Sequence, residues 1–254
     1  MESPDSTVPL GKFLALRTAL SRRAAVEAVK AGRVRLDGET VREPARRVTP
    51  GSRVELDGNA VETDEARPLR YYMLNKPRGY VCSSADPHAE KLALDLLPVE
   101  PGVRLFSAGR LDTESEGLLI FSNDGDYVEE LSHPRNRVLK RYRVEVARPL
   151  SEREMSRLRE GIADDGEVLR AIEVIPRGGC AYEFVLNEGR KREIRRMTAA
   201  VGAPTKRLRR FAVGALELGD LPEGKFRELS PEERRLSLIR APEQDAPSPS
   251  PPRK

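Results

Sequence analysis

The sequence predicts an α+β protein with a small N-terminal module and a larger second domain, built on a central mixed, largely antiparallel sheet flanked by helices. Before residue 60, helical patterns are followed by short strand patterns. Beyond residue 70, strand patterns outnumber helical ones and are often separated by short turns. This distribution favours an antiparallel sheet over a doubly wound parallel one. The length of 254 residues also exceeds one small domain.

The N-terminal module is predicted over residues 8–63 as two short helices followed by a small sheet. Apolar residues recur at helical spacing over residues 10–20, and a second helix is expected between Ser21, a typical N-cap, and Gly32, a typical C-cap. Two strand patterns follow, and each ends in Asp-Gly, a dipeptide typical of tight turns. The module is therefore expected to be compact, with its basic side chains on one surface.

The second domain is predicted over residues 70–240, after a polar linker at residues 64–69 that has no periodicity. Strands are expected at residues 71–74, 117–121, 142–146, 171–175, 182–186 and 208–213, and helices at 127–132, 151–161 and 191–201. The segment 241–254 contains five prolines and no large apolar residue. It is expected to be a disordered tail.

Charge is concentrated in two stretches. Residues 10–47 hold ten Lys or Arg against four acids, and residues 190–210 hold nine against one. Such patches attract polyphosphate backbones, although each could instead be a solvated helix face. No apolar run approaches the roughly 20 residues of a membrane span, and no signal-peptide pattern precedes residue 10. We therefore expect a cytoplasmic protein with no membrane partner and a nucleic-acid ligand.

No metal site is expected from the sequence. Cys82 and Cys180 lie far apart without nearby histidines, which indicates neither a disulfide framework nor a zinc site. Acids at alternate positions from Asp112 imitate a calcium-binding loop, but Asn123 occupies the position of its bidentate Glu, and a strand follows instead of a helix. A metal-dependent nuclease built on Glu114, Glu116, Asp124 and Asp126 is a further alternative, which requires ligands that an acidic loop does not guarantee.

The most informative stretch is residues 109–125, Gly-Arg-Leu-Asp-Thr-Glu-Ser-Glu-Gly-Leu-Leu-Ile-Phe-Ser-Asn-Asp-Gly, a polar loop that precedes an apolar strand. It resembles motif II of the RsuA/RluB-type ribosomal RNA pseudouridine synthases. Residues 72–79, 140–144 and 187–197 resemble motif I, the tyrosine strand and motif III of that family, and residues 8–63 resemble an S4 RNA-binding domain. The resemblance covers nearly the whole chain.

The resemblance implies isomerisation of a uridine in ribosomal RNA to pseudouridine, without a cofactor because nothing is consumed. Asp112 matches the essential aspartate, whose carboxylate would attack the sugar, stabilise charge or remove a proton. Arg195 matches the basic residue that pairs with it, and the alternative for Arg195 is a generic phosphate contact. Tyr142 matches the tyrosine that lies against the flipped base, although a tyrosine is also an ordinary strand residue.

The remaining predicted site residues are supporting ones. Asn75, Lys76 and Arg78 are expected to support RNA or the active-site loop, Arg110 to hold the displaced backbone, and Leu186 to form either an apolar wall for uracil or part of the core. Further RNA contacts are predicted at Arg190 and Arg196, and in the S4-like module at Lys12, Arg22, Arg23, Arg33 and Arg35. Arg192 and Glu193 differ from the residues that relatives often carry, and their roles stay open.

The predicted protein is a monomer that acts on a structured loop or stem-loop of ribosomal RNA, alone or in an assembly intermediate, since loops reduce the cost of extruding a base. The sequence does not select the uridine. A noncatalytic S4-domain RNA-binding or ribosome-assembly factor is the alternative, and the joint presence of Asp112, Tyr142 and Arg195 disfavours it.

Overall fold

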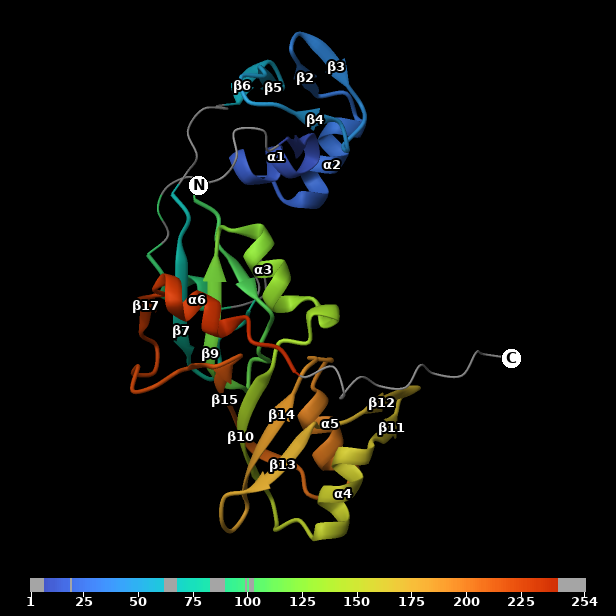
Figure 1. The fold of residues 1–254 in the computed structure, drawn as a ribbon, viewed down its shortest axis with the longest axis vertical. Coiled ribbons are helices and arrows are strands. Elements are labelled where there is room, and N and C mark those ends of the chain that lie inside the picture. The colour runs from blue at the N-terminus through green and yellow to red at the C-terminus, as the bar shows by residue number, and fades with distance from the viewer. Residues whose placement is uncertain are drawn as a thin grey trace, which may run out of the picture. The chain divides into compact units, whose positions relative to one another are not determined.

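The computed structural model describes residues 7–18, 20–61, 68–82, 90–98, 100 and 103–241. Most of the predicted linker and all of the predicted tail beyond Ala241 lie outside these residues. The chain divides into two compact units, one of residues 1–69 with 99–104, the other of residues 70–98 with 105–254 (Figure 1). The α+β class predicted from the sequence is confirmed.

The first unit contains two helices and two hairpins. Its elements are β1 (Val8–Pro9), α1 (Leu10–Arg17), α2 (Arg22–Lys30), β2 (Val34–Leu36), β3 (Glu39–Val41), β4 (Arg47–Val48), β5 (Val54–Leu56) and β6 (Asn59–Val61). The Ser21 hydroxyl accepts a hydrogen bond from the Ala24 N–H, and Gly32 follows α2 with a φ of +76°, as predicted for the two caps. Buried Leu10, Leu14 and Val29 belong to its core.

The small sheet of this unit has four strands in the order β3-β2-β5-β6. Each Asp-Gly pair adopts positive φ at both residues, 51° and 88° at Asp37 and Gly38 and 54° and 80° at Asp57 and Gly58. That conformation closes a two-residue hairpin. Strands β3 and β6, which the sequence patterns did not predict, are the second arms of these hairpins.

The second unit is organised around one large sheet. Its elements are β7 (Tyr71–Lys76), β8 (Phe106–Ala108), β9 (Glu116–Ser122), α3 (Gly125–Ser132), β10 (Lys140–Val146), α4 (Glu152–Glu160), β11 (Ile162–Asp164), β12 (Glu167–Leu169), β13 (Glu173–Pro176), β14 (Ala181–Leu186), α5 (Glu193–Ala200), β15 (Thr205–Val213), β16 (Leu216–Glu217), β17 (Phe226–Glu228) and α6 (Pro231–Ser237), with short 3₁₀ turns at Ala93–Leu96 and Pro134–Asn136. The main strand order is β13-β14-β10-β15-β9-β7-β17.

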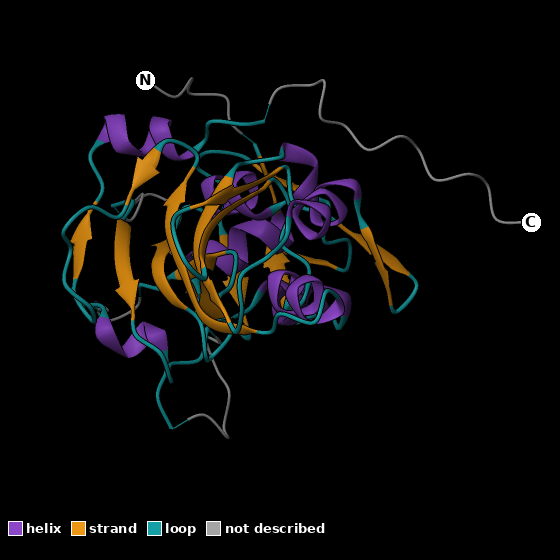
Figure 2. Cartoon of the chain, turned by 90° about the horizontal axis from the view of Figure 1, so that it is seen from below, coloured by secondary structure: helices purple, strands orange, loops and turns teal. Residues whose placement is uncertain are grey.

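The sheet is mixed because one parallel pair joins two antiparallel halves. Arg209 of β15 lies opposite Glu116 of β9, and Arg210 lies opposite Gly117, in parallel register. Helices α4 and α5 lie beside β10, β13 and β14, whereas α3 and α6 lie in the half that contains β7 and β9 (Figure 1). Figure 2 shows the strands in orange and the helices in purple, seen from below. The join therefore brings the loop before β9 close to the ends of β10, β14 and β15.

All six predicted strands and three predicted helices of this unit are present with shifted ends, whereas β8, β11, β12, β16, β17 and α6 were not predicted. The five strands among these unpredicted elements are only two or three residues long, too short for a periodic pattern. Among the described residues, no helix is long and apolar enough to cross a membrane.

Candidate active site

Asp112 lies in the loop between β8 and β9, and this loop is fixed through its backbone. The ammonium of Lys76, 0% exposed at the end of β7, donates hydrogen bonds to the carbonyls of Pro77 at 2.9 Å, Asp112 at 3.4 Å and Ser115 at 2.7 Å. The Gly79 N–H also donates to the Thr113 carbonyl at 2.8 Å. These contacts hold the loop from beneath and leave the half-buried Asp112 carboxylate without a hydrogen bond or ion pair among the described residues.

A cavity opens beside Asp112. Its lining residues are Arg110, Leu111, Asp112, Ser115, Tyr142, Leu186, Gly189, Arg190, Arg192, Glu193, Ile194 and Leu208. They come from the β8–β9 loop, from β10, β14 and β15, and from α5 with the segment that leads into it. The fold thus brings five predicted site residues to one cavity, although they are separated by up to eighty positions in the sequence.

Tyr142 and Leu186 form part of the apolar wall of this cavity. Tyr142 is 8% exposed and Leu186 is 2% exposed, so both also belong to the buried interior. In the sheet, Tyr142 lies between Phe184 of β14 and Arg210 of β15. The sequence left open whether Leu186 belongs to the core or forms a wall of the site. In the structure it does both, because the side chain is buried and lines the cavity.

Arg195 reaches the same loop but not in the expected way. Its Nη2 donates to the Glu114 carbonyl at 3.2 Å and to Ser115 Oγ at 3.4 Å, and its Nη1 lies 3.7 Å from the Glu114 carboxylate. Within the described residues, no direct ion pair joins Arg195 to Asp112, so the predicted pairing is wrong for this structure. Burial lowers the pKa of Arg195, while the charges of Glu114 and Asp112 oppose that change.

Asn75 and Lys76 do not face an RNA surface. The Asn75 side chain is 4% exposed and donates to the Leu221 carbonyl at 2.7 Å. Both residues are buried because β7 is covered on both of its faces from Tyr72 onwards. Their burial disfavours direct contact with RNA, whereas support of the active-site loop describes Lys76 well. Arg78 is exposed, and its charge acts on Arg195.

The predicted RNA contacts from the basic run have different surroundings. Arg110 is exposed at the cavity, and Arg190 lines it while donating to the Glu188 carboxylate at 3.1 Å. Arg196 lies away from the cavity lining and pairs with Asp164 and Glu167 of the β11–β12 hairpin. Arg196 thus holds that hairpin against α5, a role that the sequence did not indicate.

Three charged groups near the cavity were not predicted as site residues: Glu193 in its wall, and Lys140 and Arg210 in the strands behind it. Burial lowers the pKa of Lys140 to about 8, with the charge of Arg210 acting in the same direction. The Arg210 Nε donates to the Leu118 carbonyl at 2.8 Å. The sequence carried one indication of Lys140, because the alternation of β10 places Lys140 and Tyr142 on the same face of the strand.

Among the described residues, and unlike Asp112, two neighbouring acids pair with arginines: Glu114 in the β8–β9 loop and Glu116 at the start of β9. Glu114 lies 3.4 Å from Arg192, and Glu116 lies 2.6 Å from Arg207. In the described part of the chain, no group of three His, Cys, Asp or Glu side chains is placed to hold a metal ion. These pairings make Glu114 and Glu116 anchors for motif III and β15.

In the first unit, the predicted RNA contacts lie in different surroundings. The Arg33 guanidinium donates two hydrogen bonds to the Asp57 carboxylate, and the Arg35 guanidinium lies 3.7 Å from the Glu55 carboxylate. Arg22 and Arg23 are exposed at the start of α2, and Lys12 is half-buried on α1. Because of their exposure at one helix end, we base the RNA-binding prediction of this module mainly on Arg22 and Arg23.

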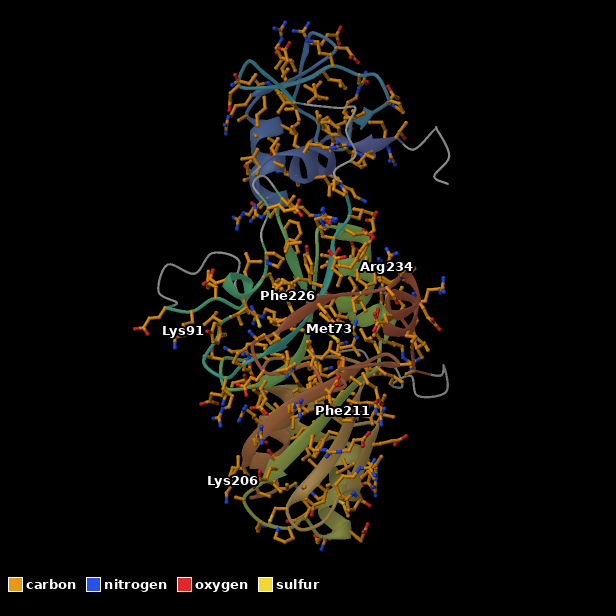
Figure 3. All side chains as sticks on the ribbon, turned by 90° about the vertical axis from the view of Figure 1, so that its left-hand side faces the viewer. Met73, Lys91, Lys206, Phe211, Phe226 and Arg234 are labelled. Carbon is orange, nitrogen blue, oxygen red and sulfur yellow. The ribbon has the colours of Figure 1, made fainter. Side chains whose placement is uncertain are left out.

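Replacing Lys76 by Met is expected to lower the free energy of unfolding by about 2–4 kcal/mol, because it leaves three carbonyls without their shared donor. Urea denaturation measures the change. Lys206→Met, at an exposed lysine of β15 (Figure 3), is the matched control and should change stability by less than about 0.5 kcal/mol. Equal effects of the two substitutions would contradict the anchoring role of Lys76.

The chain thus combines a module of two helices and a small sheet with an α+β unit whose cavity contains a carboxylate. Comparison with known proteins specifies the family. Residues 70–200 match the RNA pseudouridylate synthase family and residues 8–54 match the S4 domain. The chain belongs to the RNA pseudouridylate synthase family and is a pseudouridine synthase with an S4 domain.

Curated relatives and a solved structure agree with this assignment. An uncharacterized RNA pseudouridine synthase of Mycobacterium leprae is 37% identical over 243 residues, covering 92% of this chain and 94% of the relative. The ribosomal small subunit pseudouridine synthase A of Escherichia coli K12 is 33% identical over 229 residues, covering 88% and 97%. A crystal structure of a pseudouridylate synthase aligns with a TM-score of 0.66 at 28% identity, covering 91% of this chain and 100% of that one.

Proposed function

We propose that this enzyme converts a specific uridine of ribosomal RNA to pseudouridine, with Asp112 as the catalytic carboxylate. The observation that supports the proposal most is the cavity that Asp112 shares with Tyr142 and Leu186. The full-length similarity to relatives named as ribosomal small subunit enzymes favours small-subunit RNA as the first substrate to test.

The proposed reaction begins when the target nucleotide leaves its stack and its base enters the cavity. The apolar walls formed by Tyr142, Leu186 and Leu208 would cover the faces of the ring, and the Asp112 carboxylate would lie at the sugar. Breaking the C1′–N1 bond leaves the sugar electron-poor, where a carboxylate can bond to C1′, stabilise charge or take a proton. The base turns, and C5 bonds to C1′ while its proton leaves and N1 gains one.

Two further groups have proposed roles in this scheme. Tyr142 would stack on the base and assist the transfer of the C5 proton. Arg195 is a positioning residue, because its contacts with Glu114 and Ser115 order the loop that carries Asp112. Arg110 and Arg190, which line the same cavity, would contact the phosphates on either side of the flipped nucleotide.

The proposal is tested by incubating small- and large-subunit rRNA transcripts and assembly intermediates with the protein in EDTA and mapping pseudouridine chemically. One uridine should be modified by the wild type and left unchanged by Asp112→Asn. Tight RNA binding without modification of any uridine would favour the noncatalytic RNA-binding factor instead.

The S4 module is expected to supply affinity and not chemistry. The double substitution Arg22→Glu with Arg23→Glu should raise KM for rRNA about tenfold or more and leave kcat nearly unchanged, because phosphate contacts position the RNA. The salt dependence of RNA binding should also become shallower, by a slope of about one for every phosphate that the module no longer binds. Arg153→Glu with Arg157→Glu, two exposed arginines of α4, is the charge-matched control. Equal KM effects in both double variants would show that only net charge matters.

A further inference from the structure

Glu193 is a buried carboxylate in the wall of the cavity. It is 4% exposed at the first turn of α5 and lines the cavity together with Tyr142 and Leu186. Its Oε2 accepts a hydrogen bond from the Arg190 backbone N–H at 2.9 Å. Its Oε1 is buried and, while the neighbouring Glu188 is ionised, has no hydrogen-bond donor within the described residues. A buried oxygen of this kind is costly, so the structure leaves an acceptor that a ligand can satisfy.

Burial and the neighbouring charged groups raise the pKa of the Glu193 carboxyl group. Burial raises its pKa to about 7, and Glu188 adds to the increase through its charge and through a hydrogen bond between the two carboxyl groups, whereas the N–H and charge of Arg190 oppose it. Lys140 of β10 also acts on it, but the Lys140 ammonium donates to the Val138 carbonyl at 3.1 Å and forms no ion pair with Glu193. No cation therefore neutralises Oε1 in the described part of the chain.

The remainder of the cavity suits a planar base. Tyr142, Leu186, Ile194 and Leu208 provide apolar surface, whereas Asp112 and Ser115 lie on the loop side, where the sugar would lie. A uracil held between such walls is recognised by the hydrogen-bonding groups at its edge. The edge of uracil carries the N3–H donor between two carbonyls. The corresponding N3 of cytosine is an acceptor.

We propose that Glu193 is the specificity-determining residue for the target base, with Oε1 accepting a hydrogen bond from the uracil N3–H while Oε2 stays bound to the Arg190 N–H. This inference rests on the proposed function, because the target uridine must enter this cavity. A cytosine would place the lone pair of its N3 against a carboxylate oxygen and leave both groups buried without a donor. Such unpaired groups give strong discrimination.

Glu193→Gln tests the inference with little change of shape. The two oxygens of a carboxylate can accept hydrogen bonds from two N–H groups. The amide of glutamine has one oxygen, so its NH₂ group would face either the Arg190 N–H or the N3–H of the base. We expect kcat/KM for rRNA to fall by about 10- to 100-fold, as for loss of a hydrogen bond to a charged group, with an unchanged melting temperature. An unchanged kcat/KM would overturn the inference.

The pH profile separates recognition from a structural role. The ionised carboxylate is a stronger acceptor for N3–H than the neutral acid, so in the wild type kcat/KM should fall as the pH drops through the Glu193 pKa, about 7 in the free enzyme. This acid limb should be absent in Glu193→Gln. In Glu188→Gln it should move to lower pH, because the charge of Glu188 raises the pKa of Glu193. An identical acid limb in all three proteins would contradict the assignment.

A measurement without turnover distinguishes this inference from the proposed function. The ¹³C NMR signal of the Glu193 carboxyl group, assigned by its loss in Glu193→Gln, should shift on titration of the wild-type protein with uracil and not with cytosine. Equal shifts, or none, would reject base recognition by Glu193. If uracil alone shifts the signal while no rRNA uridine is modified, the proposed function fails and the base-reading role stands.

Discussion

Asp112→Asn is expected to reduce kcat by at least about 10³-fold and to leave RNA affinity nearly unchanged. An amide can neither bond covalently to C1′ as a carboxylate does nor carry the negative charge that would stabilise an electron-poor sugar. RNA affinity depends instead on phosphate contacts in other parts of the protein. Single-turnover pseudouridine formation and filter binding measure the two quantities separately.

The structure indicates that this variant keeps its fold. Lys76 and Gly79 hold the loop through the carbonyls of Asp112, Ser115 and Thr113, and the Asp112 carboxylate makes no such contact among the described residues. The melting temperature should therefore change little. Asp165→Asn, at an exposed hairpin position with a φ of 48° that asparagine tolerates, is the control. Substantial residual activity in Asp112→Asn would move the catalytic role to another residue.

Gly117→Ala is expected to have the largest effect on stability, a loss of at least about 3 kcal/mol. Gly117 has a φ of +106°, and a Cβ built there lies 2.2 Å from the Arg210 carbonyl oxygen. This contact is in the parallel β9–β15 pair, where neither backbone can move without breaking the sheet. Overpacking a buried site and forcing an L-residue to positive φ both destabilise the folded state. Urea denaturation, or the soluble yield if folding fails, measures the loss.

Gly178→Ala separates the two causes. Gly178 has a φ of +99° near the β13–β14 turn, and a Cβ there meets no atom within 4 Å. Its substitution should cost about 1 kcal/mol, as for conformational strain alone. If Gly117→Ala were no worse than Gly178→Ala, the close approach of β9 and β15 would not be a constraint. Gly117→Ala should also reduce activity, because β15 supplies Leu208 to the cavity.

The sequence by itself determined the elements whose causes are local. The Ser21 cap, the two Asp-Gly turns and the strands around Tyr72, Leu119 and Tyr142 follow from residues within a few positions of one another, and the structure contains them. The family also follows from continuous motifs, which is why the resemblance at residues 109–125 and 187–197 led to the RNA pseudouridylate synthase family. Most strands of two or three residues, such as β16 and β17, carry too little pattern and were missed.

Only the tertiary structure decided how charged side chains are partnered. Lys76 is buried beneath the catalytic loop, Arg195 contacts Glu114 instead of Asp112, and Glu193 retains an unpartnered oxygen in the cavity wall, as far as the described residues extend. The contact of Lys76 with Ser115 joins residues about forty positions apart, and the contact of Arg195 with Glu114 joins residues about eighty positions apart. A periodic pattern reports which face of an element is buried. It carries no information about which distant carbonyl, carboxylate or base will meet a charge on that face, because this depends on how the elements pack.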